Sequence, residues 1–149
     1  MEKFVIFSSG GQSFAIPIEV TEKIIHVEGL TRIPDTSDYV LGAIEYDDGI
    51  LPIIDLSERF FQRKTEVTSD TKVIAIKWQE KKIGLAVDKV TNIRSFESKD
   101  REVSENANQE AASYVMAFIR TEEGIILQLD VDSIFSEDGE RELVSLINR

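Results

Sequence analysis

The sequence predicts an all-β protein with short helices, built from two tandem small β-barrels of about five strands each that share an interface. Three observations predict this class. Short apolar runs alternate with clusters of turn residues, the runs are rich in β-branched residues, and the second half of the chain repeats the order of the first. At 149 residues and 42% hydrophobic content, the chain can bury a core of this kind.

The most regular element is a predicted β-hairpin at residues 39–56. Two apolar runs flank the acidic turn Asp47-Asp48-Gly49. An Asp-Gly pair between such runs is a strong hairpin signal, and we expect Gly49 to supply the positive φ of the turn.

The elements before this hairpin are also extended. Residues 4–7 and 13–20 form a second predicted hairpin, in which Pro17 places the latter strand at a sheet edge or a bulge. Residues 20–27 read as a short helical turn or bend that enters a strand. Residues 29–38 are a loop.

After the central hairpin, residues 55–64 predict a short amphipathic helix with Leu56, Phe60 and Phe61 facing inward. A polar linker, 65–70, lies near the middle of the chain. The remaining predicted elements are strands at 72–78 and 83–90, a long mobile loop at 95–113 with partial helix as the alternative, a hairpin of 114–120 with 124–131, and a helix at 138–149.

The internal repeat supports the two-barrel arrangement. Val20-Thr21 matches Val90-Thr91 at an offset of 70 residues, and Asp55 matches Asp130 at an offset of 75. The alternative explanation of these matches is that any two stretches rich in hairpins resemble each other without being a repeat. We expect a single unit over residues 1–149, with one barrel at roughly 14–66, a second at roughly 72–134, some strand exchange at the termini, and a C-terminal helix at 136–149.

Composition excludes several classes of function. With 28 acidic and 17 basic residues, the formal net charge of −11 disfavours nucleic acid and anionic membranes as partners. The absence of cysteine excludes disulfides, zinc-cysteine sites and thiol nucleophiles. We expect no signal peptide and no membrane-spanning segment, and a cytoplasmic location.

Catalytic residues are not evident. His26 is the only histidine, and no nucleophile, phosphate-loop or zinc-protease motif accompanies it. Six carboxylates could in principle form an acid/base pair or a calcium site: Asp47, Asp48, Asp55, Asp88, Asp130 and Asp132. Local roles explain most of them better, since Asp47 and Asp48 are turn residues and Asp55 and Asp130 are predicted helix caps. A small acidic hydrolase or carbohydrate-binding module therefore stays a distant alternative.

Four motifs occur in order along the chain: TRIPDTSDYVLGAI (31–44), GILPIIDL (49–56), IGLAVDKV (83–90) and GIILQLDVDSIF (124–135). In these motifs the chain resembles the CheW family of bacterial chemotaxis coupling proteins, along essentially its whole length. The resemblance implies two five-stranded SH3-like barrels and a non-catalytic adaptor without a cofactor or metal. It also implies the partners, which are the regulatory domain of a CheA-type histidine kinase, the cytoplasmic tips of chemoreceptors in membrane-bound arrays, and other CheW-like proteins.

The resemblance also points to partner-binding residues. In the first half these are Val20, Glu22 and Ile24, and the turn Asp47, Asp48 and Gly49. In the second half they are Val87, Asp88 and Val90, positions that could equally belong to the core. The family usually carries an arginine in the turn, where this chain has Asp47 or Asp48. Because this reverses the charge, a second hypothesis is an auxiliary or decoy protein that occupies array positions without coupling.

Overall fold

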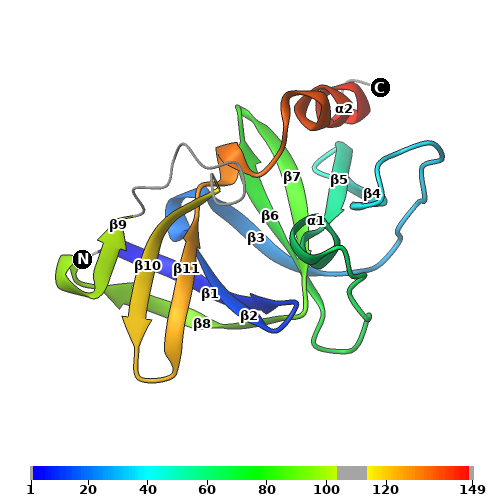
Figure 1. Cartoon of the computed structure of the whole chain (residues 1–149). Coiled ribbons are helices and arrows are strands. Elements are labelled where there is room, and N and C mark those ends of the chain that lie inside the picture. The colour runs from blue at the N-terminus through cyan, green and yellow to red at the C-terminus, as the bar shows by residue number, and fades with distance from the viewer. Residues whose placement is uncertain (1, 104–113, 148–149) are drawn as a thin grey trace.

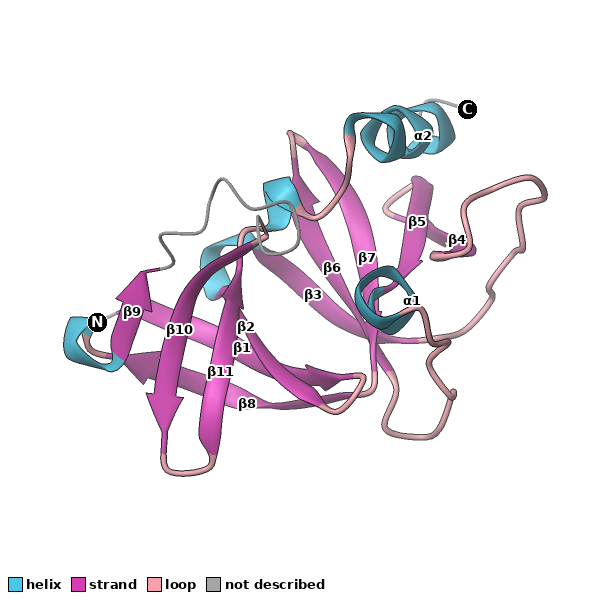
Figure 2. Ribbon diagram, in the orientation of Figure 1, coloured by secondary structure: helices cyan, strands magenta, loops and turns pink. Residues whose placement is uncertain are grey.

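The computed structural model describes residues 2–103 and 114–147, and these residues form two β-sheets with a few short helices (Figures 1 and 2). The six-stranded sheet has the order β8 (Lys89–Phe96), β1 (Glu2–Ser9), β2 (Gln12–Pro17), β11 (Gly124–Leu129), β10 (Val115–Thr121) and β9 (Arg101–Val103). The five-stranded sheet has the order β3 (Thr21–His26), β6 (Lys72–Trp78), β7 (Lys81–Val87), β5 (Gly49–Asp55) and β4 (Val40–Tyr46). The predicted fold class is confirmed.

The helices are short and lie at the ends of strands. The α-helices are α1 (Leu56–Phe61) and α2 (Glu137–Ile147), and the described 3-10 turns are η1 (Ile18–Val20), η2 (Ser98–Asp100) and η4 (Val131–Ser133). Asp55 caps α1, because its side chain accepts a hydrogen bond from the Glu58 amide, and Asp130 caps η4 by accepting from the Asp132 amide. Both predicted caps are confirmed. The C-terminal helix is also confirmed as far as Ile147.

The two sheets have the same strand order, with the leading hairpins of the two halves exchanged. The order β3-β6-β7-β5-β4 corresponds to β8-β1-β2-β11-β10, so β1 and β2 join the strands of the second half while β6 and β7 join those of the first. Strand β9 is an addition at the edge of the larger sheet. How the chain divides into two barrels stays a prediction, since each sheet takes strands from both halves.

Hydrogen bonding shows the repeat directly. The Asp55 amide donates to the Tyr39 carbonyl at 2.7 Å, and the Asp130 amide donates to the Tyr114 carbonyl at 2.8 Å. The donors of these two hydrogen bonds are 75 positions apart (130 − 55), and so are the acceptors (114 − 39). This is the offset that the sequence indicates for Asp55 and Asp130.

Near the start of each half, the structural repeat has an offset one residue shorter than the 70 that the match of Val20-Thr21 with Val90-Thr91 suggests. Glu22 is the unpaired residue of the β3 bulge, and Thr91 is the unpaired residue of the β8 bulge. These positions differ by 69 (91 − 22), so Val20-Thr21 and Val90-Thr91 are not structural equivalents.

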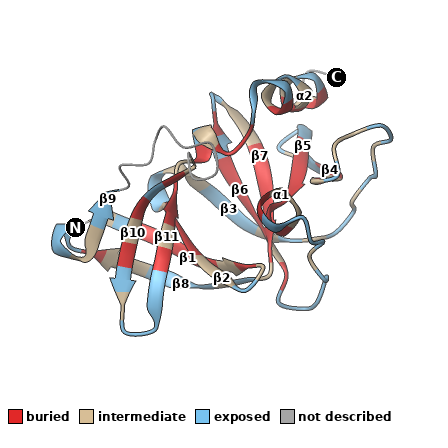
Figure 3. Ribbon diagram, in the orientation of Figure 1, coloured by how far each residue is buried: buried red, intermediate tan, exposed pale blue. Residues whose placement is uncertain are grey.

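The main core consists of buried residues from both sheets, and Figure 3 shows buried residues along the central strands of each sheet. Phe7 and Phe14 of the larger sheet and Trp78 and Leu85 of the smaller one belong to one buried cluster, and all four are at most 1% exposed. A smaller cluster lies in each sheet. The predicted shared interface is this main core.

Several local expectations were wrong. The positive φ values of the central turn belong to Asp47 (50°) and Asp48 (61°), and Gly49 begins β5. Aspartate tolerates the left-handed region, so this turn does not need its glycine there. Strand β2 lies inside its sheet, between β1 and β11, and not at the predicted edge or bulge. Pro17 is tolerated because it ends β2, two residues beyond the last residue that pairs with β11. Phe61 is exposed and its ring covers Gly10.

The predicted loop at 95–113 was also wrong for its first part. Strand β8 continues to Phe96, and η2 and β9 follow as far as Val103. Residues 104–113 of that predicted loop lie outside the described residues.

Candidate functional site

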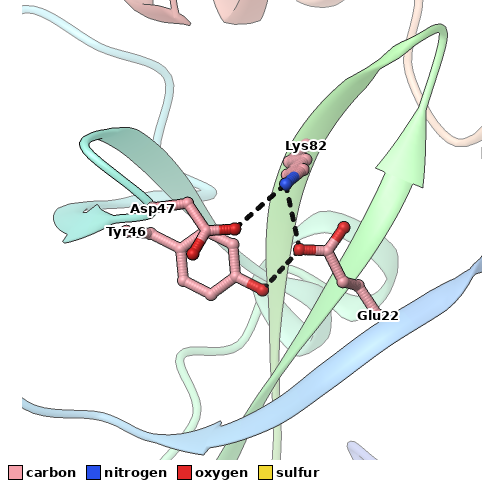
Figure 4. A network of polar contacts seen from close by, with 4 residues as sticks. All are labelled: Glu22, Tyr46, Asp47 and Lys82. Carbon is pink, nitrogen blue, oxygen red and sulfur yellow. Dashed lines mark hydrogen bonds and ion pairs between the residues drawn. The ribbon is translucent and has the colours of Figure 1, made fainter.

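Four side chains from three segments meet in a polar network beside the tip of the β4–β5 hairpin (Figure 4). The Lys82 ammonium lies 3.0 Å from the Glu22 carboxylate and 3.2 Å from that of Asp47. The Tyr46 hydroxyl donates a 2.7 Å hydrogen bond to the same oxygen of Glu22. Lys82 also lies 5.6 Å from the centre of the Tyr46 ring, within cation–π range. The network therefore joins β3, the β4–β5 turn and β7.

Local structure explains why these side chains converge. Tyr46 and Asp47 stand at the tip of the β4–β5 hairpin, where left-handed backbone at Asp47 and Asp48 closes a two-residue turn between Tyr46 and Gly49. Glu22 is the bulged residue of β3. A bulge redirects a side chain and is common where strands carry functional groups.

The network changes the proton affinities of its members. The hydrogen bond from Tyr46 and the contact with Lys82 lower the pKa of Glu22 below its usual 4.5. Desolvation, followed by the hydrogen bond to Glu22, raises the pKa of Tyr46 to about 12. Contacts with Glu22 and Asp47 raise the pKa of Lys82. At neutral pH Glu22 is therefore a carboxylate, Lys82 an ammonium and Tyr46 a neutral phenol.

The structure brings together some of the predicted partner-binding residues. Glu22 and Asp47 meet through Lys82, and Asp48 and Gly49 are exposed beside them in the turn. Ile24, further along β3, is 39% exposed. Ile24 pairs with Ile74 and Lys82 with Lys77, three residues apart on β6, so the side chains of Ile24 and Lys82 lie on opposite faces of the sheet. We call Glu22, Tyr46, Asp47, Asp48, Gly49 and Lys82 the network surface.

The other predicted residues lie elsewhere. Val87 is fully buried in the main core, and Val20 and Val90 pack against the same core from its margin. The Asp88 carboxylate accepts from the Gly10 amide at 2.9 Å, and its own amide donates to the Ser8 carbonyl at 3.0 Å. Asp88 thus joins the β7–β8 connection to the β1–β2 turn, and burial supports the core alternative for Val87.

Sequence reasoning missed Tyr46 and Lys82. Lys82 pairs with residues 35 and 60 positions away (82 − 47 and 82 − 22), and no local pattern links such distant positions. The available signal was limited to opposite charges at the ends of predicted strands.

Four of the six carboxylates considered for catalysis have structural partners, namely Asp47, Asp55, Asp88 and Asp130. The buried Asp55 accepts from the Thr65 amide at 3.0 Å and the Thr65 hydroxyl at 2.7 Å, besides capping α1. Asp130 accepts from the Ser133 hydroxyl at 2.8 Å. Within residues 2–103 and 114–147, no group of three or more His, Cys, Asp or Glu side chains could hold a metal ion. No helix in the described part of the chain is long and apolar enough to cross a membrane.

Two β-sheets packed over one shared core, with a charged network on the surface of the smaller sheet, define an all-β module. Comparison with known proteins gives the family. A model of the CheW-like domain matches residues 3–139, so the chain belongs to the CheW-like domain family.

Relatives and one solved structure agree with this assignment. The chain is 27% identical to a chemotaxis protein CheW of Klebsiella aerogenes over 92% of this chain and 83% of that protein. It is 28% identical to a chemotaxis protein CheW of Rhizobium meliloti over 94% and 90% of the two chains. The crystal structure of the scaffolding protein TtCheW from Thermoanaerobacter tengcongensis superposes with a TM-score of 0.82 at 24% identity, covering 93% of this chain and 90% of that one. The predicted resemblance to the CheW family is confirmed.

Proposed function

We propose that the protein is a non-catalytic scaffold that couples chemoreceptors to a CheA-type histidine kinase in the cytoplasm. Membership of the CheW-like domain family supports this function, as do the relatives named for chemotaxis. The observation that carries the proposal is the network of Glu22, Asp47 and Lys82, because it joins two separately predicted partner-binding segments on one surface.

Lys82 places a positive charge next to the turn, whose own charge is the reverse of the family's usual one. The family's usual arginine is absent, but the Lys82 ammonium lies 3.2 Å from Asp47 and is 43% exposed. A cation is therefore present beside the turn, contributed by β7. An ammonium group lacks the bidentate geometry of a guanidinium group, so we expect partners matched to a point charge rather than to an arginine fork.

The test is direct binding to the regulatory domain of the cognate CheA-type kinase. We expect a dissociation constant in the micromolar range or tighter, and absence of binding at micromolar concentrations would contradict the proposal. Substitution Lys82→Glu should weaken binding to the kinase domain or to the receptor tip by about tenfold, the effect of about 1.4 kcal/mol. Lys81→Glu is the matched control, since the network contacts are made by Lys82 and not by its neighbour Lys81.

The carboxylates at the turn favour a second candidate function. An auxiliary protein of the array would bind the kinase but would not transmit the receptor signal, because Asp47 and Asp48 would repel an acidic receptor surface. This candidate predicts normal kinase binding together with no receptor-dependent change in kinase activity.

A further inference from the structure

A groove runs along the β4–β5 hairpin, beneath the last turn of α2, on residues that are mostly outside the network surface. It consists of two hollows of about 620 Å³ each, which share Glu45 and Ile50. Apolar side chains from the loop before β4, from both strands and from α2 form its floor: Ile33, Ala43, Ile44, Ile50, Leu146 and Ile147. Ile50 is 45% exposed, so part of this apolar floor faces solvent.

The rim of the groove is acidic. Glu28 and Glu45 line the first hollow, and Glu45, Asp47 and Asp48 line the second. Among residues 2–103 and 114–147, no lysine or arginine lines either hollow, and Arg32, in the same loop, is outside both sets. Of these carboxylates Asp47 alone is paired with Lys82 in the network. An apolar floor with four carboxylates around it complements a ligand that is apolar and basic.

One wall of the groove is the free edge of β4. The amide and carbonyl of Ala43 both bond to Thr31, at 2.9 and 2.8 Å, and therefore point away from β5. Opposite Ala43 on β5 stands Pro52, which has no amide hydrogen to give. Successive residues of a strand alternate in direction, so the amide and carbonyl of Glu45, two residues on, also point outward. No described residue pairs with β4 on this side beyond Thr31.

We propose that this groove binds an extended segment of a partner protein in which apolar residues alternate with lysine or arginine. The segment continues the short pairing of Thr31 with Ala43 and takes the main-chain groups of Glu45, in the manner of strand addition. Its apolar side chains lie on the floor near Ile50 and Leu146. Glu45 lies opposite Ile50 on the same face, so the basic side chains reach Glu45 and Glu28, both exposed at the rim, by bending their long chains around the strand edge. An extended ligand is favoured over a helix because a helix leaves the edge groups of β4 unbonded. The proposal does not depend on the kinase-coupling function.

The probe is a short synthetic peptide in which lysine and valine alternate, and the readout is the set of backbone amides of the isotope-labelled protein that shift in NMR spectra. We expect saturable shifts centred on Thr31, Glu45 and Ile50, with a dissociation constant of about 10 μM to 1 mM, as suits a small interface. The peptide should also slow hydrogen exchange at the Glu45 amide. Added salt should weaken the binding.

The controls separate this groove from non-specific attraction to an acidic protein. A peptide in which glutamate and valine alternate should bind at least tenfold more weakly. Glu45→Lys and, separately, Ile50→Ser should each weaken binding of the basic peptide, while Glu122→Lys, in the corresponding turn of the other sheet, should leave it unchanged. Absence of binding, shifts centred on another face, equal binding of the acidic peptide, or equal loss with Glu122→Lys would each overturn the proposal.

Discussion

The ammonium nitrogen of Lys82 lies 3.0 Å from a carboxylate oxygen of Glu22, although 60 positions (82 − 22) separate the two residues. The contact ties edge strand β3 to β7, and Asp47 extends it to the β4–β5 turn. Because this contact shifts the pKa values of both residues, we expect its contribution to the unfolding free energy to depend on pH.

The signs of the pKa shifts give the pH window. The lowered pKa of Glu22 gives stability that is present above its ordinary 4.5 and is lost as the pH falls through the folded value. The raised pKa of Lys82 gives stability that is present below 10.5 and is lost as the pH rises through the folded value. For Tyr46, raised to about 12, the loss falls between 10 and 12.

We therefore predict that Lys82→Met lowers the unfolding free energy most between about pH 5 and pH 10, and that this effect declines as the pH falls through the lowered pKa of Glu22. The measurement is urea unfolding across this pH range, followed by fluorescence of Trp78, the only tryptophan, which is fully buried. Lys81→Met is the control. An effect of Lys82→Met that persists undiminished at acid pH would show that its cost does not come from the ion pairs.

Arg101 predicts a contrast between two surface arginines on neighbouring strands. Its guanidinium donates a 2.7 Å hydrogen bond to the side chain of the buried Gln128 and lies 5.4 Å from the centre of the Phe4 ring. Arg101→Met leaves the Gln128 oxygen without this donor, so we expect a loss of about 1–3 kcal/mol in unfolding free energy.

The control is Arg120→Met. Arg120 also makes a 2.7 Å contact, with Glu102, but the two side chains are 73% and 64% exposed, so we expect about 0–1 kcal/mol. Urea unfolding of both variants tests the contrast. Equal losses would mean that Arg101 does not support the buried amide.

Asp55 and Asp130 occupy equivalent positions but differ in burial. Asp55 is 2% exposed and accepts from both the amide and the hydroxyl of Thr65 in the linker, as well as from the Glu58 amide. We expect Asp55→Ala to cost about 2 kcal/mol or more, because several donors lose their acceptor inside the protein. Asp130→Ala, at the more exposed cap of η4, should cost about 1 kcal/mol. A larger loss for Asp130→Ala in equilibrium unfolding would be inconsistent with these roles.

Alanine substitutions at two glycines, Gly49 next to the central turn and Gly84 inside β7, should have different costs. Gly49 has no positive φ, and a Cβ there would lie 3.6 Å from the Tyr46 carbonyl, an ordinary contact. Gly49→Ala should therefore change the unfolding free energy by no more than about 0.5 kcal/mol. A Cβ on Gly84 would lie 2.6 Å from Val73 and 2.7 Å from Ile53, so Gly84→Ala should cost about 1–3 kcal/mol through overpacking. Thermal or urea unfolding in which Gly49→Ala is the more damaging variant would refute this assignment.

Local chemistry made the hairpins predictable. Alternating apolar residues and turn residues identify β4 with β5 and β10 with β11, and the cap at Asp55 follows from its place between a strand and a helix. The internal repeat predicted the equivalence of Asp55 and Asp130. It did not reveal that β6 and β7 join the sheet of the first half, because strand partners are chosen by packing between distant segments.

The candidate site was less predictable for the same reason. Glu22 and Asp47 could be proposed from the family resemblance, but Lys82 and Tyr46 join them only in the folded chain. The β9 segment was missed because Arg101 and Glu102 look like loop residues, and they pair with β10 at a sheet edge where charged residues are favoured. The roles of the site residues in partner binding stay predictions.

The central claim, that the protein couples receptors to a kinase, is tested most directly by kinase activity in reconstituted receptor arrays. The cognate receptors and CheA-type kinase are assembled on membranes with and without this protein, and autophosphorylation of the kinase is measured before and after addition of a receptor ligand. We predict that the protein makes kinase activity dependent on the receptor, and that Lys82→Glu weakens this dependence more than Lys81→Glu does. Kinase activity that is indifferent to receptor ligand, although the protein is bound, would contradict the coupling function.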